Sequence, residues 1–345
     1  MKYFKFISFL FFTLFVLNVT NVLAFTPCDS TGICRDVPFA KPDGKNLTLD
    51  IYLPKDKTVQ AIPIIVIYGG GWSAGSKADC RAVIDIELLR QNGYAAICPN
   101  YRLTSAGYTF PAQIHDVKAA VRFIRANASK YNLNVNKIGV MGGSAGGQLS
   151  SLLGVSGGSV QLEGGDLGNA NYSSSVQAVV TEFGPSFFLP TNLAVTNKNF
   201  LGAYKAYLGD LPNGKNAATV NAYDASPVNY VDKNDPPFLL IHGKNDDVVP
   251  VYHSQLLDKK LKSVGVDSTL YEYSTDGVNH VANTHETLPD DYANRSIAFF
   301  DRVLKKDNIV KSLNPVIIAS TSVPIKTEES FKNKIINFFS KFWKK

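Results

Sequence analysis

Short apolar runs alternate with helix-compatible stretches along the chain, and each run has the length of one strand. The clearest apolar runs cover residues 62–67 and 237–241, and strand-like runs also cover 137–141 and 268–273. Residues 148–153 follow the run at 137–141 closely and are compatible with a helix. Continuous apolar runs are typical of strands that are buried on both faces in parallel sheets. The alternation therefore predicts an α/β protein with a mostly parallel, doubly wound sheet.

The N-terminal end has the form of a secretory signal. Lys2 and Lys5 lead into an apolar stretch, and residues 22–24 offer a cleavage site. The apolar stretch is too short for a comfortable transmembrane span. We therefore expect residues 1–24 to be a signal peptide and the protein to be secreted or periplasmic. An uncleaved anchor is the alternative.

The C-terminal residues 306–345 read as a linker followed by a basic amphipathic tail. Within residues 331–345, Phe331, Ile335 and Phe342 recur on one helical face, and lysines dominate the other positions. A helix of this kind is typical of segments that lie on an anionic membrane surface, and we expect such a contact here. The alternatives are a helix docked on the protein's own apolar patch and a disordered tail.

The two ends also account for the net charge of +6. Residues 1–24 contribute +2 and residues 326–345 contribute +4, so the stretch between them is neutral. Nothing in that stretch indicates nucleic-acid binding.

Export would place the four cysteines in an oxidising compartment, where disulfides form. Four cysteines allow three pairings. We favour Cys28 with Cys34, a short local loop, and Cys80 with Cys98, which would join a helix to the neighbouring strand. None of them lies in a loop of catalytic type, and the sequence contains no visible metal-ligand cluster. We therefore expect no cysteine nucleophile, no metal and no other cofactor.

Residues 142–146 read Gly-Gly-Ser-Ala-Gly and lie between a strand-like run and a helix. This is the G-x-S-x-G pattern in the context of a nucleophile elbow. The glycines allow a sharp bend that lifts the Ser144 hydroxyl clear of the sheet. The next amide, at Ala145, lies at a helix N-terminus, where an N–H can stabilise an oxyanion. The alternative is a glycine-rich turn with a chance serine.

A nucleophilic serine needs a base, and the base needs an orienting carboxylate. The apolar run at 237–241 ends in a loop that carries two candidate acids, Asp246 and Asp247. Loops at the carboxyl ends of parallel strands are where α/β proteins place their chemistry. We expect His242, at the strand end, to order this loop rather than to act as the base.

The base is expected in the loop after residues 268–273. His280 is the first candidate there, and His285 is the second. His115 precedes the serine in the chain, which the order Ser, acid, His excludes. His253 falls in a helical pattern and is interpreted as structural.

Upstream, the apolar run at 62–67 leads into the glycine run 69–71. Glycines at this place let backbone N–H groups face a small cavity with no side chains in the way. The alternative is a flexible glycine hairpin. The run is not a phosphate loop, because the G-x-x-x-x-G-K-[ST] pattern is absent from the sequence.

Further motifs occur in order along the chain. Residues 99–103 resemble a "DYRL" strand end, residues 110–120 resemble a pre-nucleophile helix, and residues 225–231 resemble a return to the core sheet. With the serine motif, they resemble the α/β-hydrolase superfamily over about residues 40–305. The resemblance is to the branch with hormone-sensitive-lipase-like carboxylesterases and the bifunctional feruloyl/acetyl-xylan esterase group.

The resemblance implies a role for each matching residue. It makes Asp246 rather than Asp247 the acid and His280 the base, and it places the oxyanion donors at the amides of Gly70, Gly71 and Ala145. Two departures stand out: Tyr68 replaces the histidine that usually opens the H-G-G-G loop, and the base loop lacks the usual G-H-G pattern.

We place the α/β-hydrolase domain at residues 25–305. Residues 186–225 are polar and turn-rich with several aromatics and do not read as core strand. In this fold such an insertion usually forms a small cap over the serine and sets acyl selectivity. A plain surface excursion is the alternative.

These features predict a secreted serine carboxylesterase that cleaves short-chain, acetyl-type esters through an acyl-enzyme. Its substrate would be a small-molecule, carbohydrate or lipid ester. One alternative is amide-type hydrolysis on the same fold, by an arylformamidase or a prolyl-oligopeptidase-like peptidase. Another is a non-catalytic binding module with a hydrolase fold.

Overall fold

A computed structural model describes residues 28–188, 198–209, 217–274, 280 and 291–305 of the chain. The expected signal peptide at 1–24 and the expected tail at 306–345 lie outside the described residues. No helix among the described residues combines the length and the apolar composition that a membrane crossing requires.

The described residues form an eight-stranded sheet in the order β1-β2-β4-β3-β5-β6-β7-β8. From β4 to β8 across this order the neighbours are parallel, whereas β2 runs antiparallel to both β1 and β4. The mostly parallel sheet predicted from the sequence is therefore confirmed. The strands are β1 (Ile33–Ala40), β2 (Leu47–Tyr52), β3 (Ile62–Ile67), β4 (Tyr94–Pro99), β5 (Gly139–Gly143), β6 (Ala178–Glu182), β7 (Phe238–Gly243) and β8 (Ser268–Tyr273).

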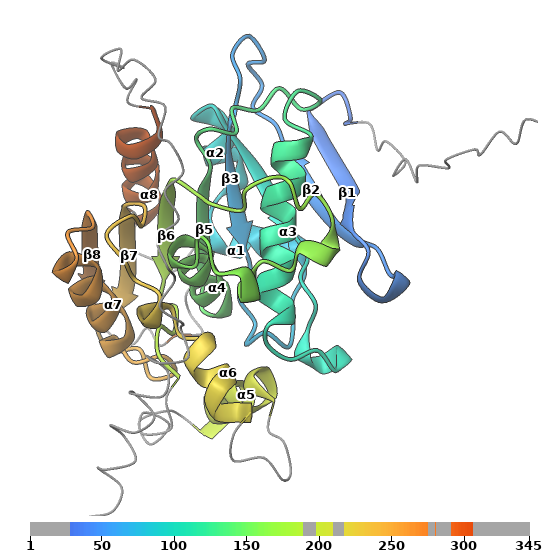
Figure 1. The fold of residues 1–345 in the computed structure, drawn as a ribbon. Helices are drawn as coiled ribbons and strands as arrows, with labels where there is room; N and C mark the ends of the chain where they lie inside the picture. Colours follow the sequence, from blue (N-terminus) through green and yellow to red (C-terminus); the bar gives the residue numbers. More distant parts are fainter. Residues whose placement is uncertain (1–27, 189–197, 210–216, 275–279, 281–290, 306–345) are drawn as a thin grey trace, which may run out of the picture. The chain divides into compact units, whose positions relative to one another are not determined.

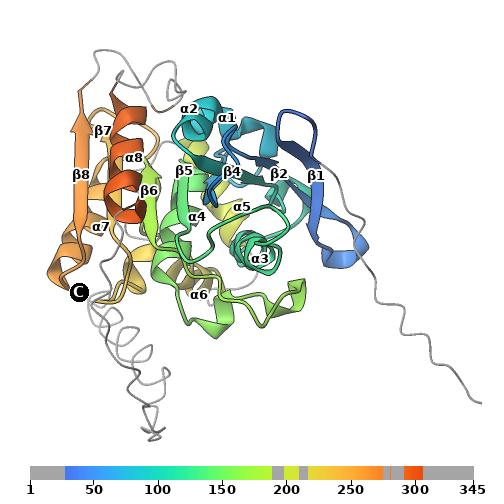
Figure 2. The same cartoon turned by 90° about the horizontal axis from the view of Figure 1, so that it is seen from above.

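Helices cover both faces of the sheet. Figure 2 shows α3, α4 and α7 on one face and α1, α2 and α8 on the other. The helices are α1 (Cys80–Val83), α2 (Ile86–Gln91), α3 (Ala112–Ala126), α4 (Ala145–Val155), α5 (Lys198–Leu208), α6 (Ala217–Asp224), α7 (Tyr252–Ser263) and α8 (Tyr292–Phe300). Short 3-10 turns cover Pro42–Gly44, Lys77–Asp79, Thr104–Ala106, Val160–Leu162, Gly165–Leu167 and Pro227–Asn229, and a π turn, Asp301–Lys305, follows α8.

The two-faced burial explains the continuous apolar runs. In β3, Ile65 and Ile67 belong to the core cluster on one face, and Ile64 and Val66 belong to the cluster on the other. A strand that is buried on both faces has no polar side, because successive side chains point in opposite directions.

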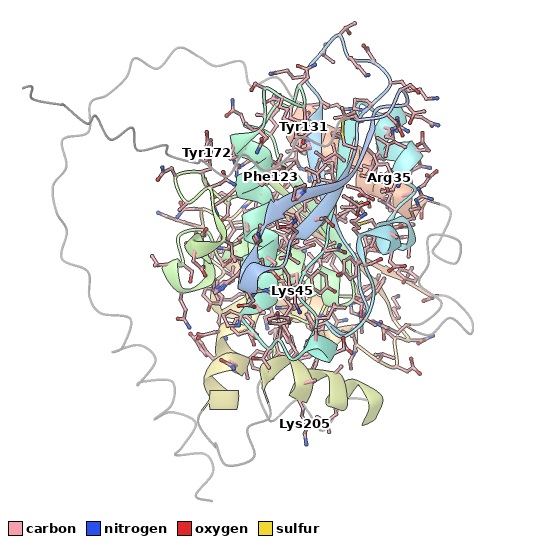
Figure 3. All side chains as sticks on the ribbon, turned by 90° about the vertical axis from the view of Figure 1, so that its right-hand side faces the viewer. Arg35, Lys45, Phe123, Tyr131, Tyr172 and Lys205 are labelled. Carbon is pink, nitrogen blue, oxygen red and sulfur yellow. A yellow bond between two sulfur atoms is a disulfide. The ribbon has the colours of Figure 1, made fainter. Side chains whose placement is uncertain are left out.

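The segment 186–225 contains α5 and α6 and no described strand. Figure 1 shows both helices together at one end of the sheet, beyond the tips of β5 and β6. Figure 3 shows Lys205 pointing outward from α5 at this end.

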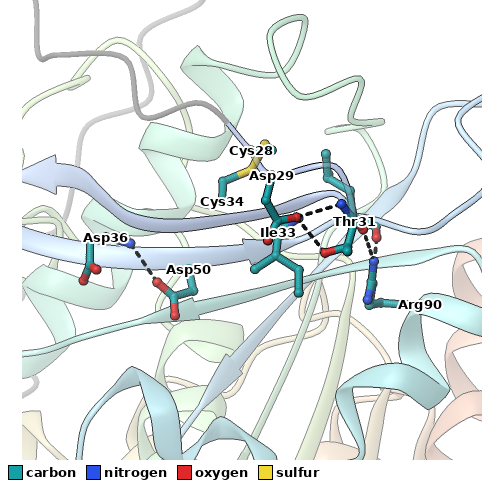
Figure 4. Close-up of a disulfide and its surroundings, with 9 residues drawn as sticks. Cys28, Asp29, Thr31, Ile33, Cys34, Asp36, Asp50 and Arg90 are labelled. Atoms are coloured by element: carbon teal, nitrogen blue, oxygen red, sulfur yellow. Dashed lines mark hydrogen bonds between the residues drawn. A yellow bond between two sulfur atoms is a disulfide. The ribbon is translucent and has the colours of Figure 1, made fainter.

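The cysteines follow the predicted pairing only in part. Cys28 and Cys34 form a disulfide next to β1 (Figure 4). Cys80 and Cys98 are free and buried, so the second predicted disulfide is wrong. Instead, the Cys80 thiol donates to the carbonyl of Val66 on β3 at 2.9 Å, which satisfies it within the core. Burial and the neighbouring Cys98 raise the pKa of the Cys80 thiol, so the thiolate needed for disulfide exchange is disfavoured.

Candidate active site

Ser144 lies at the bend between β5 and α4, as the G-x-S-x-G pattern predicts. Its backbone is left-handed, with φ 55° and ψ −120°. A Cβ on Gly146 would collide with the Ile67 carbonyl oxygen and would lie 2.6 Å from that of Tyr68. The Ser144 N–H donates to the Glu182 carbonyl at 2.9 Å, which ties the bend to β6. Because a Cβ at position 146 would clash with the carbonyls of Ile67 and Tyr68, glycine is required there for α4 to pass this close to the end of β3.

Three of the predicted site residues meet at this bend. The Oγ of Ser144 lies 2.9 Å from Nε2 of His280, and Nδ1 of His280 lies 2.7 Å from Oδ2 of Asp246. The His280 ring also packs edge-on against Phe183, with the ring centroids 5.0 Å apart. The second base candidate, His285, lies outside the described residues.

The loop after β7 distinguishes the two candidate acids. Asp246 is buried and faces His280, whereas Asp247 is exposed. The other oxygen of Asp246 accepts the N–H groups of Val248 and Val249, at 2.9 and 2.8 Å. Burial alone would raise the pKa of Asp246, but hydrogen bonds from His242 and His280 bring it well below its usual range. Asp246 is therefore a fixed carboxylate facing the imidazole.

The glycine run 69–71 lies directly against the serine. A Cβ on Gly69 would lie 3.3 Å from the Cβ of Ser144. Gly70 and Gly71 have φ values of 105° and 59°, in the left-handed region that favours glycine. Turns, loops and caps of the described residues contain many backbone hydrogen bonds. In none of them is the donor the N–H group of Gly70, Gly71 or Ala145. The three amides predicted as oxyanion donors are therefore candidates for binding an anion.

Tyr101 takes over the anchoring of the glycine loop. The Tyr101 hydroxyl lies 3.2 Å from the carbonyl oxygens of both Tyr68 and Gly69. The rings of Tyr68 and Tyr101 stack with centroids 4.4 Å apart and an interplanar angle of 12°. The departure from histidine at position 68 is therefore accommodated by a tyrosine pair that holds the start of the loop.

Sequence reasoning missed a polar junction between the loop, α4 and α5. The Oε1 of Gln148, on α4, accepts from the indole N–H of Trp72 at 3.0 Å and from the hydroxyl of Tyr207 at 3.2 Å. Its amide nitrogen donates to the Ala225 carbonyl at 2.8 Å. Trp72 and Tyr207 stack with centroids 4.2 Å apart. The available signal was a lone glutamine among apolar residues, immediately after the elbow.

The described residues contain no group of three or more His, Cys, Asp or Glu side chains arranged to hold a metal ion.

Comparison with known proteins finds esterases among the similar sequences. Esterase LipC of Mycobacterium tuberculosis is 30% identical over 222 residues, which cover 63% of this chain and 52% of LipC. An acetylxylan esterase of Xylanibacter ruminicola is 35% identical over 111 residues, which cover 32% of this chain and 22% of that protein. The chain spans about half the length of the first curated relatives that it matches.

Solved structures extend the likeness to most of the chain. A truncated carbohydrate esterase from gut microbiota superposes with a TM-score of 0.67 at 30% identity, covering 81% of this chain and 99% of that one. A bifunctional GH43-CE protein of Bacteroides eggerthii gives a TM-score of 0.66 at 33% identity, covering 79% of this chain and 35% of that one. The profile of the BD-FAE family matches residues 49–261, more than half of the sequence. The chain therefore belongs to the BD-FAE family and has the α/β-hydrolase fold.

Proposed function

We propose that this protein is a serine esterase that hydrolyses carboxylic esters through an acyl-enzyme. Ser144 is the nucleophile, His280 the general base and Asp246 the acid. The observation that carries this proposal is the unbroken line of hydrogen bonds from Ser144 to His280, at 2.9 Å, and from His280 to Asp246, at 2.7 Å. Nucleophile, base and orienting acid in this arrangement are the requirements for an activated serine.

The hydrogen bonds support one direction for each proposed proton transfer. Since the carboxylate of Asp246 only accepts, Nδ1 of His280 carries a proton and Nε2 has a lone pair for the Ser144 hydroxyl. Nε2 takes the hydroxyl proton while Oγ attacks the ester carbonyl carbon. Asp246 stabilises the imidazolium that forms.

The developing oxyanion is bound by the N–H groups of Gly70, Gly71 and Ala145. Each donor contributes on the order of 3 kcal/mol to transition-state stabilisation. His280 then protonates the departing alcohol, and the acyl group stays on Ser144. A water molecule attacks this acyl-enzyme while His280 takes its proton. His280 then returns that proton to Oγ of Ser144 as the bond to the acyl group breaks, which releases the acid and restores the serine.

We propose short, acetyl-type acyl groups as the substrate class, with carbohydrate esters as one source. Support comes from the acetylxylan esterase and carbohydrate esterase among the similar proteins. The cap segment also approaches the glycine loop closely, because a Cβ on Gly71 would lie 3.4 Å from the methyl group of Ala203 on α5. Little room for a long acyl chain remains on that side of the loop.

We further propose export of the protein, with removal of residues 1–24, and contact of residues 331–345 with a membrane surface. The Cys28–Cys34 disulfide supports export, since such bonds persist in oxidising compartments. The tail proposal rests on the sequence pattern alone.

Hydrolysis of p-nitrophenyl acetate, butyrate, octanoate and palmitate by the purified protein tests the function. We expect turnover of the short esters, and a fall in kcat of roughly 10⁴-fold or more in Ser144→Ala. Ser105→Ala is the matched control, because Ser105 is exposed and, within the part of the chain that the structure describes, its hydroxyl donates to the carbonyl of Ser73 alone. Wild-type rates in Ser144→Ala would refute the proposed nucleophile. Activity on the long esters alone would refute the acetyl-type class.

A further inference from the structure

A second histidine lies behind the acid, and its hydrogen bonds fix its tautomer. His242, at the end of β7, is completely buried. Its Nε2 lies 2.8 Å from the Val249 carbonyl oxygen and 3.4 Å from Oδ2 of Asp246, and its Nδ1 lies 2.7 Å from the hydroxyl of Ser254. A carbonyl oxygen only accepts, so Nε2 must carry a proton. In the neutral ring, Nδ1 therefore accepts from Ser254.

These contacts close a ring around the carboxylate. The Val249 N–H donates to Oδ1 of Asp246 at 2.8 Å, and the carbonyl of the same residue accepts from His242. The Nε2–H of His242 thus donates to the Val249 carbonyl, and Oδ2 of Asp246 lies 3.4 Å from the same nitrogen. Oδ2 is the same oxygen that accepts from His280.

We propose that His242 and Ser254 are positioning residues for the acid of the triad. Ser254 on α7 fixes the ring of His242, and His242 shares the Asp246 carboxylate with His280. This inference rests on the proposed function, because it assigns a task within the same site. The chain of contacts runs from Ser254 on α7 to His242 on β7, and from there through Asp246 to the base.

The sharing has a definite electrostatic direction. The Nε2–H of His242, 3.4 Å from Oδ2, places positive partial charge beside the carboxylate, which weakens the attraction of Asp246 for the imidazolium form of His280. Removing the His242 donor strengthens that attraction. The acidic limb of kcat/KM would then move to a higher pH.

Other titratable groups face this centre from each element packed against it. Burial lowers the pKa of His253, on α7, to about 4, so its ring is neutral above that pH. Burial raises the pKa of Tyr204 on α5, of Tyr273 on β8 and of Glu182 on β6. All of them remain when His242 is changed. A difference between variant and wild-type profiles therefore reports on His242.

The test compares His242→Leu, which removes the donor, with His242→Gln, whose amide N–H reaches toward the place of Nε2–H. We expect the acidic limb of kcat/KM for p-nitrophenyl acetate to rise by roughly half a pH unit or more in His242→Leu. The same variant should lose roughly ten-fold at the plateau. His242→Gln should return the acidic limb to its wild-type position. Ser254→Ala should raise the pH of the limb by less than His242→Leu does. His115→Leu is the control, because His115 also bonds a backbone carbonyl, that of Gln161 at 3.0 Å, outside the site.

A purely structural role for His242 predicts a different result. Both His242 variants would lose thermal stability and leave the pH limb unmoved, and that outcome would overturn the proposal. If His242→Leu does not fold, long-range ¹H–¹⁵N spectra of the wild-type protein still decide the matter. They should report a proton on Nε2 of His242, and a proton on Nδ1 alone would overturn the arrangement. This spectrum does not depend on turnover, whereas undiminished hydrolysis by Ser144→Ala would remove the proposed function itself.

Discussion

Left-handed backbone conformations gather around the serine. Ser144 has a φ of 55°, and Gly70 and Gly71 have φ values of 105° and 59°. A non-glycine residue in this conformation costs on the order of 1–3 kcal/mol and persists only when its surroundings hold it. The hydrogen bond from Ser144 N–H to the Glu182 carbonyl supplies part of that support. Substitution of a single residue in this region should therefore destabilise the fold.

Two glycines on different helices test how closely the backbone packs around the serine. Gly146→Ala, on α4, would push a methyl group into the Ile67 and Tyr68 carbonyls, and we expect a loss of roughly 3 kcal/mol of folding stability. Gly202→Ala, on α5, is the matched control, because a Cβ there has no neighbour within 4 Å. Alanine at 202 should stabilise the protein by about 1 kcal/mol. Urea unfolding measures both changes, and equal effects would contradict the close packing at Gly146.

At this scale the sequence predicts residue types better than their partners. The structure brings Ser144, His280 and Asp246 together, because a strand end determines where a following loop lies. The tyrosine pair of Tyr68 and Tyr101 could not be predicted, since it depends on how far apart the tips of β3 and β4 lie. The unformed Cys80–Cys98 bond has a similar cause: nearness in the fold does not decide whether a thiol finds another partner.

Among the elements, the parallel strands were the most predictable. The apolar run at 62–67 coincides with β3, and the run at 237–241 overlaps β7, because burial on both faces leaves a clear signal. The antiparallel β1–β2 pair was not predicted, since its residues alternate less regularly and its register is irregular. The helices α5 and α6 were also missed, because their helical pattern is masked by aromatics that pack on other elements.

The junction around Gln148 links α5 to the glycine loop, and its removal should change acyl selectivity. Gln148→Leu would leave the Trp72 indole and the Tyr207 hydroxyl without their shared acceptor, which should cost roughly 2 kcal/mol of stability. We expect the ratio of acetate to octanoate hydrolysis to fall as α5 loosens. Tyr207→Phe removes only one of these bonds and should have a smaller effect, about 1 kcal/mol. An unchanged substrate ratio in both variants would exclude α5 from acyl selection.

For the molecule as a whole, the sheet places every proposed catalytic group at the carboxyl ends of its parallel strands. The serine follows β5, the acid follows β7, the base follows β8 and the glycine loop follows β3. The carboxyl ends of parallel strands all lie on the same side of the sheet, and groups that are distant in sequence therefore converge there. The same packing buries several titratable side chains, and it makes global stability depend on pH.

His253 gives the clearest case. Burial lowers its pKa from 6.5 to about 4, so the unfolded chain binds a proton in this pH window that the folded protein does not. Stability should therefore be full above about pH 6.5 and fall as the pH drops toward 4, by roughly 3 kcal/mol. His253→Leu should flatten this part of the curve in urea unfolding. Comparison near pH 7.5, where the ring is neutral in both states, isolates the packing cost, and an unchanged slope in the variant would contradict the assignment.

The shared acceptor on Gln148 also constrains how this protein can exchange parts with its relatives. A cap taken from another member of the family would need a hydroxyl at the place of Tyr207 to match the amide on α4 and the indole on the glycine loop. Recombinants that cross over between residue 148 and α5 should therefore fail more often than those that inherit the two together. Trp72, Gln148 and Tyr207 should therefore come from the same parent sequence, although the first and the last are 135 positions apart.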